Sequence, residues 1–386
     1  MNIRHLDNSI SSHFDTYRQA IILLGARQVG KTTLLKKIFP KAHYLLLDNQ
    51  HTKQVLESYD INTYRQILGQ HKVVILDELH LLTNPGRAVK IIYDQLPSIK
   101  LVVTGSSSFH IKNKTSESMA GRKIDYHLYP LTFSEYLVQT KVESSLNTRL
   151  LDHLIQNSPP SIHSYSPSEI ASNAMVFGLY PEIINLPQNT TYLSNLADSA
   201  IFKDILELNL IDNQTKAKQL LKLLAHQIGN LINYSELSNK LGLDQRTVKK
   251  YIEIFEQSFI VYRLYPYSTR TRNELTKTPK IYFWDLGLRN AIINNFEPIT
   301  LRPDAGALFE NFIITEIHKL NIYTSANYKL HYWRTKAGAE IDLVLTKNNN
   351  LYACEIKLTN GRLTPAFKSR YPDAKTKLIN LNNFYP

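Results

Sequence analysis

Short runs of apolar residues alternate with segments of helical periodicity over the N-terminal third of the chain. Runs of about four to eight apolar residues are typical of buried strands, whereas a 3.6-residue period is typical of helices. The runs predict strands at 20–24, 42–48, 73–76 and 100–104, and the periodic segments predict helices at 32–38, 54–68 and 85–96. Alternating strands and helices predict an α/β fold with a parallel sheet and helices on both faces.

The pattern changes after residue 215. A periodic segment at 216–231 is followed by two shorter ones at 234–241 and 244–255, which Gly242 separates, and then by an apolar stretch at 259–267. Two helices joined by a glycine turn and followed by a strand predict a winged helix-turn-helix, with Asp244 as N-cap of its second helix. Its expected core residues are Leu237, Leu241, Leu243, Val248 and Ile252.

The C-terminal region shows a third arrangement. A helix that is apolar on one face is predicted at 305–317, and strands are predicted at 330–335, 340–345 and 351–357. Turns rich in Gly, Asn and Lys separate these strands. The order predicts a second, smaller α/β domain.

The segment 25–32 has the complete spacing G-x-x-x-x-G-K-T between a predicted strand and a predicted helix. Gly25 and Gly30 permit a tight turn in which successive backbone N–H groups point toward phosphate oxygens. Lys31 is expected to reach the β- and γ-phosphates of ATP, and Thr32 to place its hydroxyl on Mg²⁺. The expected nucleotide-binding residues are Gly25, Ala26, Arg27, Gln28, Val29, Gly30, Lys31, Thr32, Thr33 and Asp77.

The predicted strand at 73–76 ends in two acids, Asp77 and Glu78, which is the form of a Walker B strand. Asp77 is expected to hold Mg²⁺ through water, and Glu78 to orient the attacking water as general base. The strand at 100–104 ends in hydroxyl residues, so Thr104 or Ser106 is the candidate sensor of the γ-phosphate. Such hydroxyls are equally typical of a strand that simply ends in a turn.

The chain has 386 residues, of which 45 are Lys or Arg and 33 are Asp or Glu, so its formal net charge is +12. This excess suits a polyanionic partner, although a uniformly basic surface has the same total. Cys354 is the only cysteine, which excludes an internal disulfide and favours the cytoplasm. The charged N-terminus is unlike a signal peptide, and no stretch approaches the roughly 20 apolar residues of a membrane span.

Positive charge is concentrated in residues 216–280, which contain 12 Lys or Arg and 5 Asp or Glu, a net charge of +7. The second helix of the predicted helix-turn-helix is expected to present Gln245, Arg246, Lys249 and Lys250 outward. Such a helix binds the phosphates and the major groove of duplex DNA. The sequence therefore predicts double-stranded DNA as a partner. Packing of the winged helix against another domain is the alternative.

Asp342, Glu355 and Lys357 form the pattern D, then E-x-K on the next predicted strand. Because side chains alternate along a strand, Glu355 and Lys357 share one face, and the hairpin brings Asp342 alongside. Two carboxylates at this spacing can hold Mg²⁺ or Mn²⁺, while the lysine positions or helps to deprotonate the water that attacks a phosphodiester. A solvated hairpin face that happens to carry these charges is the alternative.

Several motifs together resemble the bacterial and archaeal AAA+-type P-loop ATPases that carry a C-terminal domain of unknown function. They are the segment 25–32, the Asp77-Glu78 pair, and the segments 104–107, 120–122 and 129–136. The resemblance implies that Arg122 is a γ-phosphate or intersubunit arginine, and a surface arginine in a loop is the alternative. The sequence does not decide whether the protein forms an oligomer. The segment 177–182 resembles an aromatic-Gly-Gly-x-Pro-Glu element of that family, with Leu179 in place of the second glycine.

The C-terminal residues 300–386 resemble the PD-(D/E)XK nuclease superfamily through Asp342, Glu355 and Lys357. The resemblance implies that Glu310 is the acid often found on the first helix of that fold. Ile341 stands where the family name has proline. The expected domains are an ATPase core at 1–150, a helical lid or linker at 151–215, a winged helix at 216–280 and a nuclease-like domain at 281–386.

Two functions are consistent with these patterns. The first is an ATP-dependent protein that binds duplex DNA and cuts it with a divalent metal. The second is a non-cleaving switch, whose ATP and ADP states reposition the C-terminal half to bind a protein or DNA partner. Binding of Mn²⁺ that falls on Asp342→Asn distinguishes the first from the second.

Overall fold

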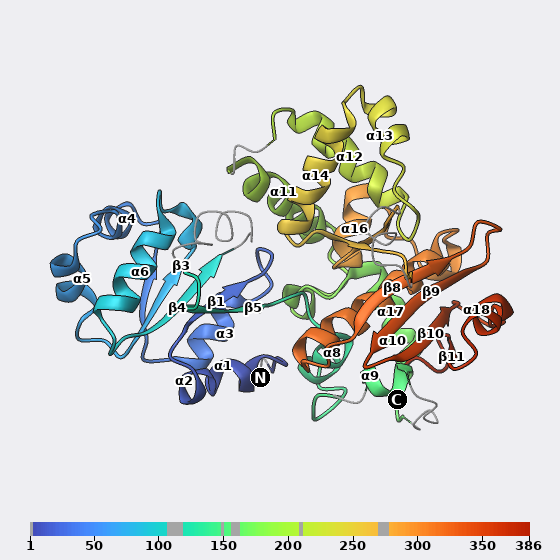
Figure 1. Cartoon of the computed structure of the whole chain (residues 1–386), viewed down its shortest axis with the longest axis horizontal. Helices are drawn as coiled ribbons and strands as arrows, with labels where there is room; N and C mark the ends of the chain where they lie inside the picture. The colour runs from blue at the N-terminus through green and yellow to red at the C-terminus, as the bar shows by residue number, and fades with distance from the viewer. Residues whose placement is uncertain (1–2, 106–118, 148–149, 156–162, 208–210, 269–277) are drawn as a thin grey trace. The chain divides into compact units, whose positions relative to one another are not determined.

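The computed structural model describes residues 3–105, 119–147, 150–155, 163–207, 211–268 and 278–386. The chain forms two compact units, each with its own sheet (Figure 1). The first unit contains Met1–Pro130, Phe202–Leu210 and Gln257–Phe259, and the second contains Leu131–Ile201, Ile211–Glu256 and Ile260–Pro386.

The first unit is built on a five-stranded sheet in the order β2-β3-β4-β1-β5, and all neighbouring strands are parallel. The strands are β1 (Ala20–Leu24), β2 (His43–Leu46), β3 (Val73–Asp77), β4 (Lys100–Gly105) and β5 (Lys123–His127). This confirms the predicted parallel α/β fold. The prediction that the second strand is buried is wrong, because β2 lies at the edge of the sheet and is partly exposed.

The helices of the first unit follow the predicted alternation, with two differences: two short helices before the first strand were not predicted, and one predicted helix is divided. They are α1 (Asp7–Ser11), α2 (His13–Thr16), α3 (Lys31–Ile38), α4 (Gln50–Glu57), α5 (Ile61–Leu68), the 3-10 turn η1 (Leu79–Leu81) and α6 (Pro85–Gln95). The single helix predicted at 54–68 is wrong, because the chain breaks between α4 and α5. Tyr59 has a left-handed backbone with φ of 49°, and the Asp60 carboxylate caps α5 by accepting a hydrogen bond from Thr63 N at 2.7 Å.

The second unit begins with helices that pack onto its later elements. They are α8 (Phe133–Gln139), α9 (Leu150–Ile155), α10 (Pro167–Phe177), the 3-10 turn η2 (Pro181–Ile184) and α11 (Thr190–Glu207). Helix α10 contacts both α16 (Leu286–Ile293) and α17 (Ala305–Tyr323), and α9 contacts α17 and the C-terminal sheet. Residues far apart in sequence therefore share the core of this unit.

The middle of the second unit contains α12 (Gln214–His226), α13 (Tyr234–Leu241) and α14 (Gln245–Gln257), followed by the antiparallel strands β6 (Val261–Leu264) and β7 (Lys280–Phe283). The expected turn and cap are present. Gly242 is left-handed with φ of 58°, and Asp244 Oδ1 accepts a hydrogen bond from Thr247 N at 2.9 Å. Of the predicted core residues, Leu243 is only partly buried, and the other four are buried.

The C-terminal sheet has the order β11-β10-β9-β8 and follows α17. Its elements are β8 (Lys329–Arg334), β9 (Glu340–Lys347), β10 (Asn350–Ile356), α18 (Pro365–Arg370), β11 (Lys375–Ile379) and, between α16 and α17, the turn η3 (Ile299–Leu301). Strand β9 pairs antiparallel with β8 and β10, whereas β10 and β11 are parallel. The predicted order of a helix and three strands is confirmed.

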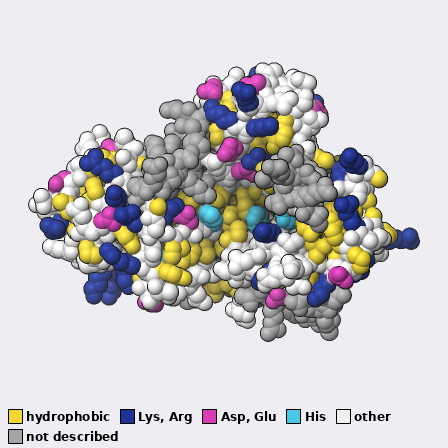
Figure 2. All heavy atoms as spheres, in the orientation of Figure 1, with side chains coloured by type: hydrophobic (Ala, Val, Ile, Leu, Met, Phe, Trp, Pro, Cys, Tyr) yellow, Lys and Arg dark blue, Asp and Glu magenta, His cyan; other side chains and the backbone are white. Residues whose placement is uncertain are grey.

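Basic side chains are spread across the face of the molecule that Figure 2 shows. On this face, Lys and Arg lie among Asp and Glu over both units and do not form one continuous patch. Among the residues that the structure describes, no helix has the length and apolar character needed to cross a membrane.

Candidate functional site

The predicted nucleotide loop connects β1 to α3, as its motif requires. The loop backbone passes so close to the end of β5 that a Cβ on Gly25 would lie 2.1 Å from the carbonyl oxygen of Leu128. Gly30 is left-handed with φ of 93°, and Gln28 has φ of 61°. These two left-handed residues turn the chain tightly between strand and helix. Gly25 and Gly30 thus have separate steric reasons to be glycine.

Lys31 begins α3 and turns its side chain back over the loop. The residue is only 6% exposed, and its ammonium donates hydrogen bonds to the carbonyl oxygens of Gly25 at 2.8 Å and Ala26 at 2.9 Å. The start of a helix favours anions because its first N–H groups lack partners within the helix. The loop therefore combines a lysine charge and a helix N-terminus at one place.

Thr32, in the first turn of α3, meets Asp77 and Thr104 at the carboxyl ends of the adjacent strands β3 and β4. Thr32 Oγ1 donates to Asp77 Oδ2 at 3.1 Å, and Thr104 Oγ1 donates to Asp77 Oδ1. Thr104 Oγ1 also accepts a hydrogen bond from the backbone N–H of Glu78 at 3.2 Å. A hydroxyl and a carboxylate in contact are ligands of the kind that Mg²⁺ prefers, so Thr32 and Asp77 fit the predicted metal site. Ser106, the other sensor candidate, lies outside the described residues.

Glu78 follows β3 with a left-handed backbone, φ 62°, which directs its side chain away from the line of the strand. Its Oε2 lies 3.1 Å from Nδ1 of His80. Burial opposes ionisation, but contact with His80 and the positive charge of Lys31 lower the pKa of Glu78 to about 2. The carboxylate is therefore ionised at neutral pH and can accept a hydrogen bond from water.

Arg4 supports the loop from a distant part of the chain. Its Nη1 donates to the carbonyl oxygen of Val29 at 2.8 Å, and its Nη2 to that of Tyr129 at 2.6 Å. Arg4 is buried, and it ties the nucleotide loop to the segment after β5. The sequence pattern contains no signal for this role, because the contact spans 25 residues to one partner and 125 to the other.

Arg122 lies at the amino ends of β1 and β5, whereas the nucleotide loop follows the carboxyl end of β1. Its carbonyl oxygen accepts a hydrogen bond from Ala20 N, the first residue of β1. Its guanidinium binds Asp94, with Nε 2.8 Å from Oδ1 and Nη2 3.1 Å from Oδ2. This position contradicts a γ-phosphate contact within the same chain. An intersubunit role stays a prediction.

The second unit brings together Asp342, Glu355 and Lys357. Leu343 of β9 is paired with Cys354 of β10, so Asp342 and Glu355 are opposite each other. Both carboxylates are buried, and Lys357 Nζ lies 3.1 Å from Asp342 Oδ2 and 3.1 Å from Glu355 Oε1. The expected juxtaposition is therefore present.

Backbone and side-chain donors hold the two carboxylates in place. Asp342 Oδ2 accepts a hydrogen bond from Ile356 N at 2.7 Å, and Glu355 Oε2 accepts one from Thr364 Oγ1 at 3.2 Å. Burial, followed by the nearby charge of Asp342, raises the pKa of Glu355 above its ordinary value. Two carboxylates this close together suit a cation between them, and in this structure the Lys357 ammonium contacts both.

Glu310, the predicted acid of α17, lies close to a lysine and a tyrosine from β7. Its Oε1 accepts hydrogen bonds from Lys280 Nζ at 3.0 Å and from Tyr282 Oη at 2.6 Å. Burial lowers the pKa of Lys280, but the carboxylates of Glu310 and Glu340 raise it above its ordinary value. Lys280 and Tyr282 were not expected here. Their sequence positions precede Asp342 by about 60 residues, and no motif contains them.

The cluster does not contain a complete set of metal ligands by itself. Within the described ranges, no group of three or more His, Cys, Asp and Glu side chains has an arrangement that could hold a metal ion. Asp342 and Glu355 therefore provide at most two protein ligands, and water or a phosphate oxygen would have to supply the others.

The exposed face of α14 carries the residues expected to bind DNA. Gln245, Arg246, Lys249 and Lys250 are exposed, and Val248 between them is buried. Lys249 Nζ lies 5.2 Å from the centre of the Tyr234 ring, and Lys250 Nζ lies 3.3 Å from Asp212 Oδ2. The predicted outward orientation is confirmed, whereas DNA binding stays a prediction.

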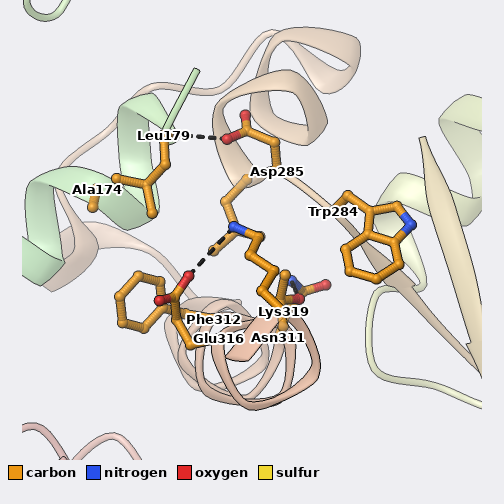
Figure 3. A pocket seen from close by; sticks show the side chains of 11 residues that line it. Ala174, Leu179, Trp284, Asp285, Asn311, Phe312, Glu316 and Lys319 are labelled. Atoms are coloured by element: carbon orange, nitrogen blue, oxygen red, sulfur yellow. Dashed lines mark hydrogen bonds and ion pairs between the residues drawn. The ribbon is translucent and has the colours of Figure 1, made fainter. Parts of the chain in front are cut away.

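The segment after α10 is fixed by a buried polar cluster (Figure 3). Leu179 N donates to Asp285 Oδ2 at 2.7 Å, and Glu316 Oε1 lies 3.3 Å from Lys319 Nζ. These groups line a cavity of about 20 Å³, which has room for about one water molecule. Glu316 also accepts a hydrogen bond from Phe133 N at 2.7 Å. The cluster thus joins α8, α10, α16 and α17.

Three known families match successive parts of the chain. Residues 17–137 match the family described as AAA domain, residues 168–298 match the domain of unknown function DUF8612, and residues 305–383 match the domain of unknown function DUF4143. The chain is therefore similar to AAA-type ATPases with C-terminal domains of unknown function. The P-loop fold of the first unit supports ATP binding, typically with Mg²⁺.

Similar proteins occur in archaea and bacteria. An uncharacterized protein of Methanocaldococcus jannaschii is 26% identical over 354 residues, which cover 85% of this chain and 73% of the relative. An uncharacterized protein of Mycobacterium tuberculosis is 25% identical over 344 residues, covering 88% and 70%. Among solved structures, the Walker-type ATPase of Pyrococcus abyssi has a TM-score of 0.49 at 13% identity and covers 76% of this chain and 96% of its own.

Proposed function

We propose that this protein is an ATP-hydrolysing enzyme that acts on DNA. Its first unit binds ATP and Mg²⁺, α14 binds duplex DNA, and the C-terminal sheet cleaves a phosphodiester with a divalent ion, Mg²⁺ or Mn²⁺. The observation that carries the nuclease part is the approach of Lys357 Nζ to within 3.1 Å of both Asp342 and Glu355.

The ATPase part rests on groups that already touch one another. Lys31 and the loop N–H groups bind the phosphates, Thr32 and Asp77 hold Mg²⁺, and Glu78 orients the attacking water. The low pKa of Glu78 means that it acts chiefly as a hydrogen-bond acceptor for water and does not retain a proton at neutral pH. Arg122 lies at the amino end of β1, away from the nucleotide loop, so it acts on the nucleotide of a neighbouring copy if the protein forms an oligomer.

The nuclease part assigns separate tasks to three side chains. Asp342 and Glu355 hold the divalent ion, which when bound polarises the phosphodiester and lowers the pKa of a bound water. Lys357 is 41% exposed, so its ammonium can leave the two carboxylates and contact a phosphate oxygen or the attacking water. Ile356 N and Thr364 Oγ1 keep the carboxylates in position while this happens.

The DNA part rests on α14 and its surroundings. Helices α13 and α14 with the ribbon β6–β7 have the order of a winged helix-turn-helix. Arg246, Lys249 and Lys250 are exposed on α14 and present positive charge to a phosphate backbone. Because the exposed side of α14 is polar and basic, it suits nucleic acid better than an apolar protein surface.

A non-cleaving ATP/ADP switch is the second candidate, and one observation favours it. Within the described part of the chain, no group of three or more His, Cys, Asp and Glu side chains could hold a metal ion. In that case, the C-terminal sheet binds a protein or DNA partner, and the internal ion pairs stabilise its fold.

Nicking of supercoiled plasmid tests the proposal. The full chain is incubated with plasmid in Mg²⁺ or Mn²⁺, with and without ATP, beside four variants: Asp342→Asn, Lys357→Ala, Lys31→Ala and Arg246→Ala. Two exposed residues provide matched controls, Asp373→Asn in the C-terminal region and Lys36→Ala on α3.

We expect the wild type and both controls to cleave, and Asp342→Asn to lose cleavage by at least about 100-fold. Lys31→Ala should abolish ATP turnover and any response of cleavage to ATP, and Arg246→Ala should weaken DNA binding and reduce its salt dependence. Absence of cleavage under every condition favours the switch. Cleavage that persists in Lys357→Ala rejects the assignment of the site.

A further inference from the structure

A lysine from the ribbon β6–β7 is buried against the acids of the C-terminal site. Lys280 is 3% exposed, and its Nζ lies 3.0 Å from Glu310 Oε1 on α17 and 2.5 Å from Glu340 Oε1 on β9. Glu340 and Asp342 are two positions apart on β9, so they project from the same side of the strand. Lys280 therefore stands beside the carboxylate pair to which the proposed function assigns the divalent ion.

The position of Lys280 is fixed from two directions. Lys280 and Tyr282 are two positions apart on β7, so they lie on the same face of the strand. Both donate a hydrogen bond to Glu310 Oε1. The backbone of Lys280 pairs with Leu264 of β6 and forms a bridge with Leu231. Gly229, in the turn after α12, lies close to the same carboxylate, since a Cβ there would lie 3.6 Å from Glu310 Oε1. The Lys280 ammonium is thus part of a buried side chain on a paired strand, and not of a mobile side chain on the surface.

The packing around Glu310 favours a cation at this place. The Glu310 side chain is only 16% exposed, and burying a carboxylate without a partner costs several kcal/mol. Glu340 is 25% exposed and is also paired with Arg334 Nη1 at 3.3 Å, so Lys280 is its second cationic partner. The distance of 2.5 Å from Nζ to Glu340 Oε1 falls within the range of about 2.0 to 2.6 Å for bonds between divalent ions and oxygen, and the distance of 3.0 Å to Glu310 Oε1 is slightly longer. Lys280 therefore fills a place that could accept a metal ion.

We propose that Lys280 is a positioning residue that serves as a permanent cation beside Glu310 and Glu340, so that the C-terminal site takes one divalent ion, on Asp342 and Glu355. This inference rests on the proposed metal site. It assigns Glu310 to the support of the site and not to the metal. It also places a residue of the ribbon that follows the helix-turn-helix inside the candidate catalytic region.

Counting bound Mn²⁺ tests this inference. Equilibrium dialysis is performed on the nucleotide-free full chain carrying Asp77→Asn, which removes the carboxylate of the first unit's metal site. Lys280→Met is added to this background. Lys319→Met is the matched control, because Lys319 is also buried in the second unit and pairs with a glutamate, Glu316, at 3.3 Å.

We expect one Mn²⁺ per chain in the background protein and in Lys319→Met, and two in Lys280→Met. One ion in Lys280→Met overturns the inference and leaves the proposed metal site intact. No ion in the background protein rejects the proposed Asp342–Glu355 centre. If Lys280→Met then gains one ion, the role of Lys280 as a cation beside Glu310 is retained.

Glu310→Gln provides the test if Lys280→Met does not fold. The amide oxygen can still accept hydrogen bonds from Lys280 and Tyr282, so the packing is preserved. We expect one Mn²⁺ with an affinity within about twofold of the background protein. A loss of tenfold or more identifies Glu310 as a metal ligand and overturns the inference.

Discussion

Thr104 is the side chain whose role in the structure differs most from the role that its local sequence suggests. A hydroxyl at the end of a strand is ordinarily explained by a turn. Here it bridges the two acids of the Walker B strand, because it donates to the Asp77 carboxylate and accepts from Glu78 N. Thr104 therefore orients Asp77 and Glu78, to which we assign Mg²⁺ and the attacking water. It is a positioning residue of the site.

Replacing Thr104 with valine tests this role. Thr104→Val keeps the shape of the side chain but removes both hydrogen bonds, so the Asp77 carboxylate loses a donor and the Glu78 N–H loses an acceptor. We expect ATP hydrolysis to fall about 10- to 100-fold, as for other groups that orient metal ligands, while ATP affinity changes little. Steady-state hydrolysis and binding of a fluorescent ATP analogue measure the two effects.

Thr104→Ser is the control, because it keeps the hydroxyl and should retain activity within a few-fold. Loss of the buried hydrogen bonds in Thr104→Val also costs about 1 to 3 kcal/mol of stability. Hydrolysis at the wild-type rate in Thr104→Val would mean that the hydroxyl only ends the strand.

The turn between α10 and η2 shows how one short element organises its neighbours. Gly178 is left-handed with φ of 76°, and the next residue, Leu179, donates its backbone N–H to Asp285. Since the hydrogen bond uses the backbone and Leu179 does not have positive φ, a second glycine is not required there. The departure of Leu179 from the family's Gly-Gly pattern is therefore compatible with the same turn.

Gly178→Ala should destabilise the second unit strongly. A Cβ at this position would lie 2.3 Å from Asp285 Oδ1 and 2.7 Å from Gly287 N, in addition to the strain of the left-handed backbone. We expect a loss of about 3 kcal/mol or more in the free energy of unfolding. Both tryptophans, Trp284 and Trp333, lie in the second unit, so urea unfolding followed by tryptophan fluorescence measures this loss.

Gly338→Ala separates backbone strain from the clash. Gly338 is also left-handed, with φ of 91°, but a Cβ there meets no atom within 4 Å. Only the strain of about 1 to 2 kcal/mol is then expected. Equal effects of the two substitutions would contradict the steric explanation for Gly178.

The complete chain combines two compact units with separate sheets and cores. Ligand binding stabilises the folded state to which the ligand binds. All of the residues that we assign to ATP lie in the first unit, whereas Trp284 and Trp333 lie in the second. The effect of nucleotide on the stability of each unit can therefore be measured separately.

ATP should stabilise the first unit without stabilising the second to the same extent. In the Glu78→Gln background, which is expected to bind ATP but to hydrolyse it slowly, ATP at 100 times its Kd contributes about 2.7 kcal/mol. We expect calorimetry to show one transition that moves to higher temperature, while the transition detected by tryptophan fluorescence stays in place. Lys31→Ala should abolish the shift. Equal movement of both transitions would show that the units unfold together.

Interactions between neighbouring residues were predicted well from the sequence. The strand, glycine loop and helix of the nucleotide site and the Asp244 cap of α14 depend on partners a few residues away. The pairing of Asp342 with Glu355 also follows from local geometry, because a short hairpin determines which residues are opposite each other. Such features are encoded in spacing alone.

Contacts between distant segments were decided only by the tertiary structure. Strand β5 was not predicted, and neither was the contact of Arg4 with the nucleotide loop. The same holds for the place of Arg122 at the amino end of β1 and for the contact of Lys280 with Glu310. None of these follows from periodicity, because packing of the whole unit determines which side chains meet. The chain's sequence therefore determines its elements and motifs, whereas the fold decides which charges are brought together and buried, and burial in turn sets their pKa values and their chemistry.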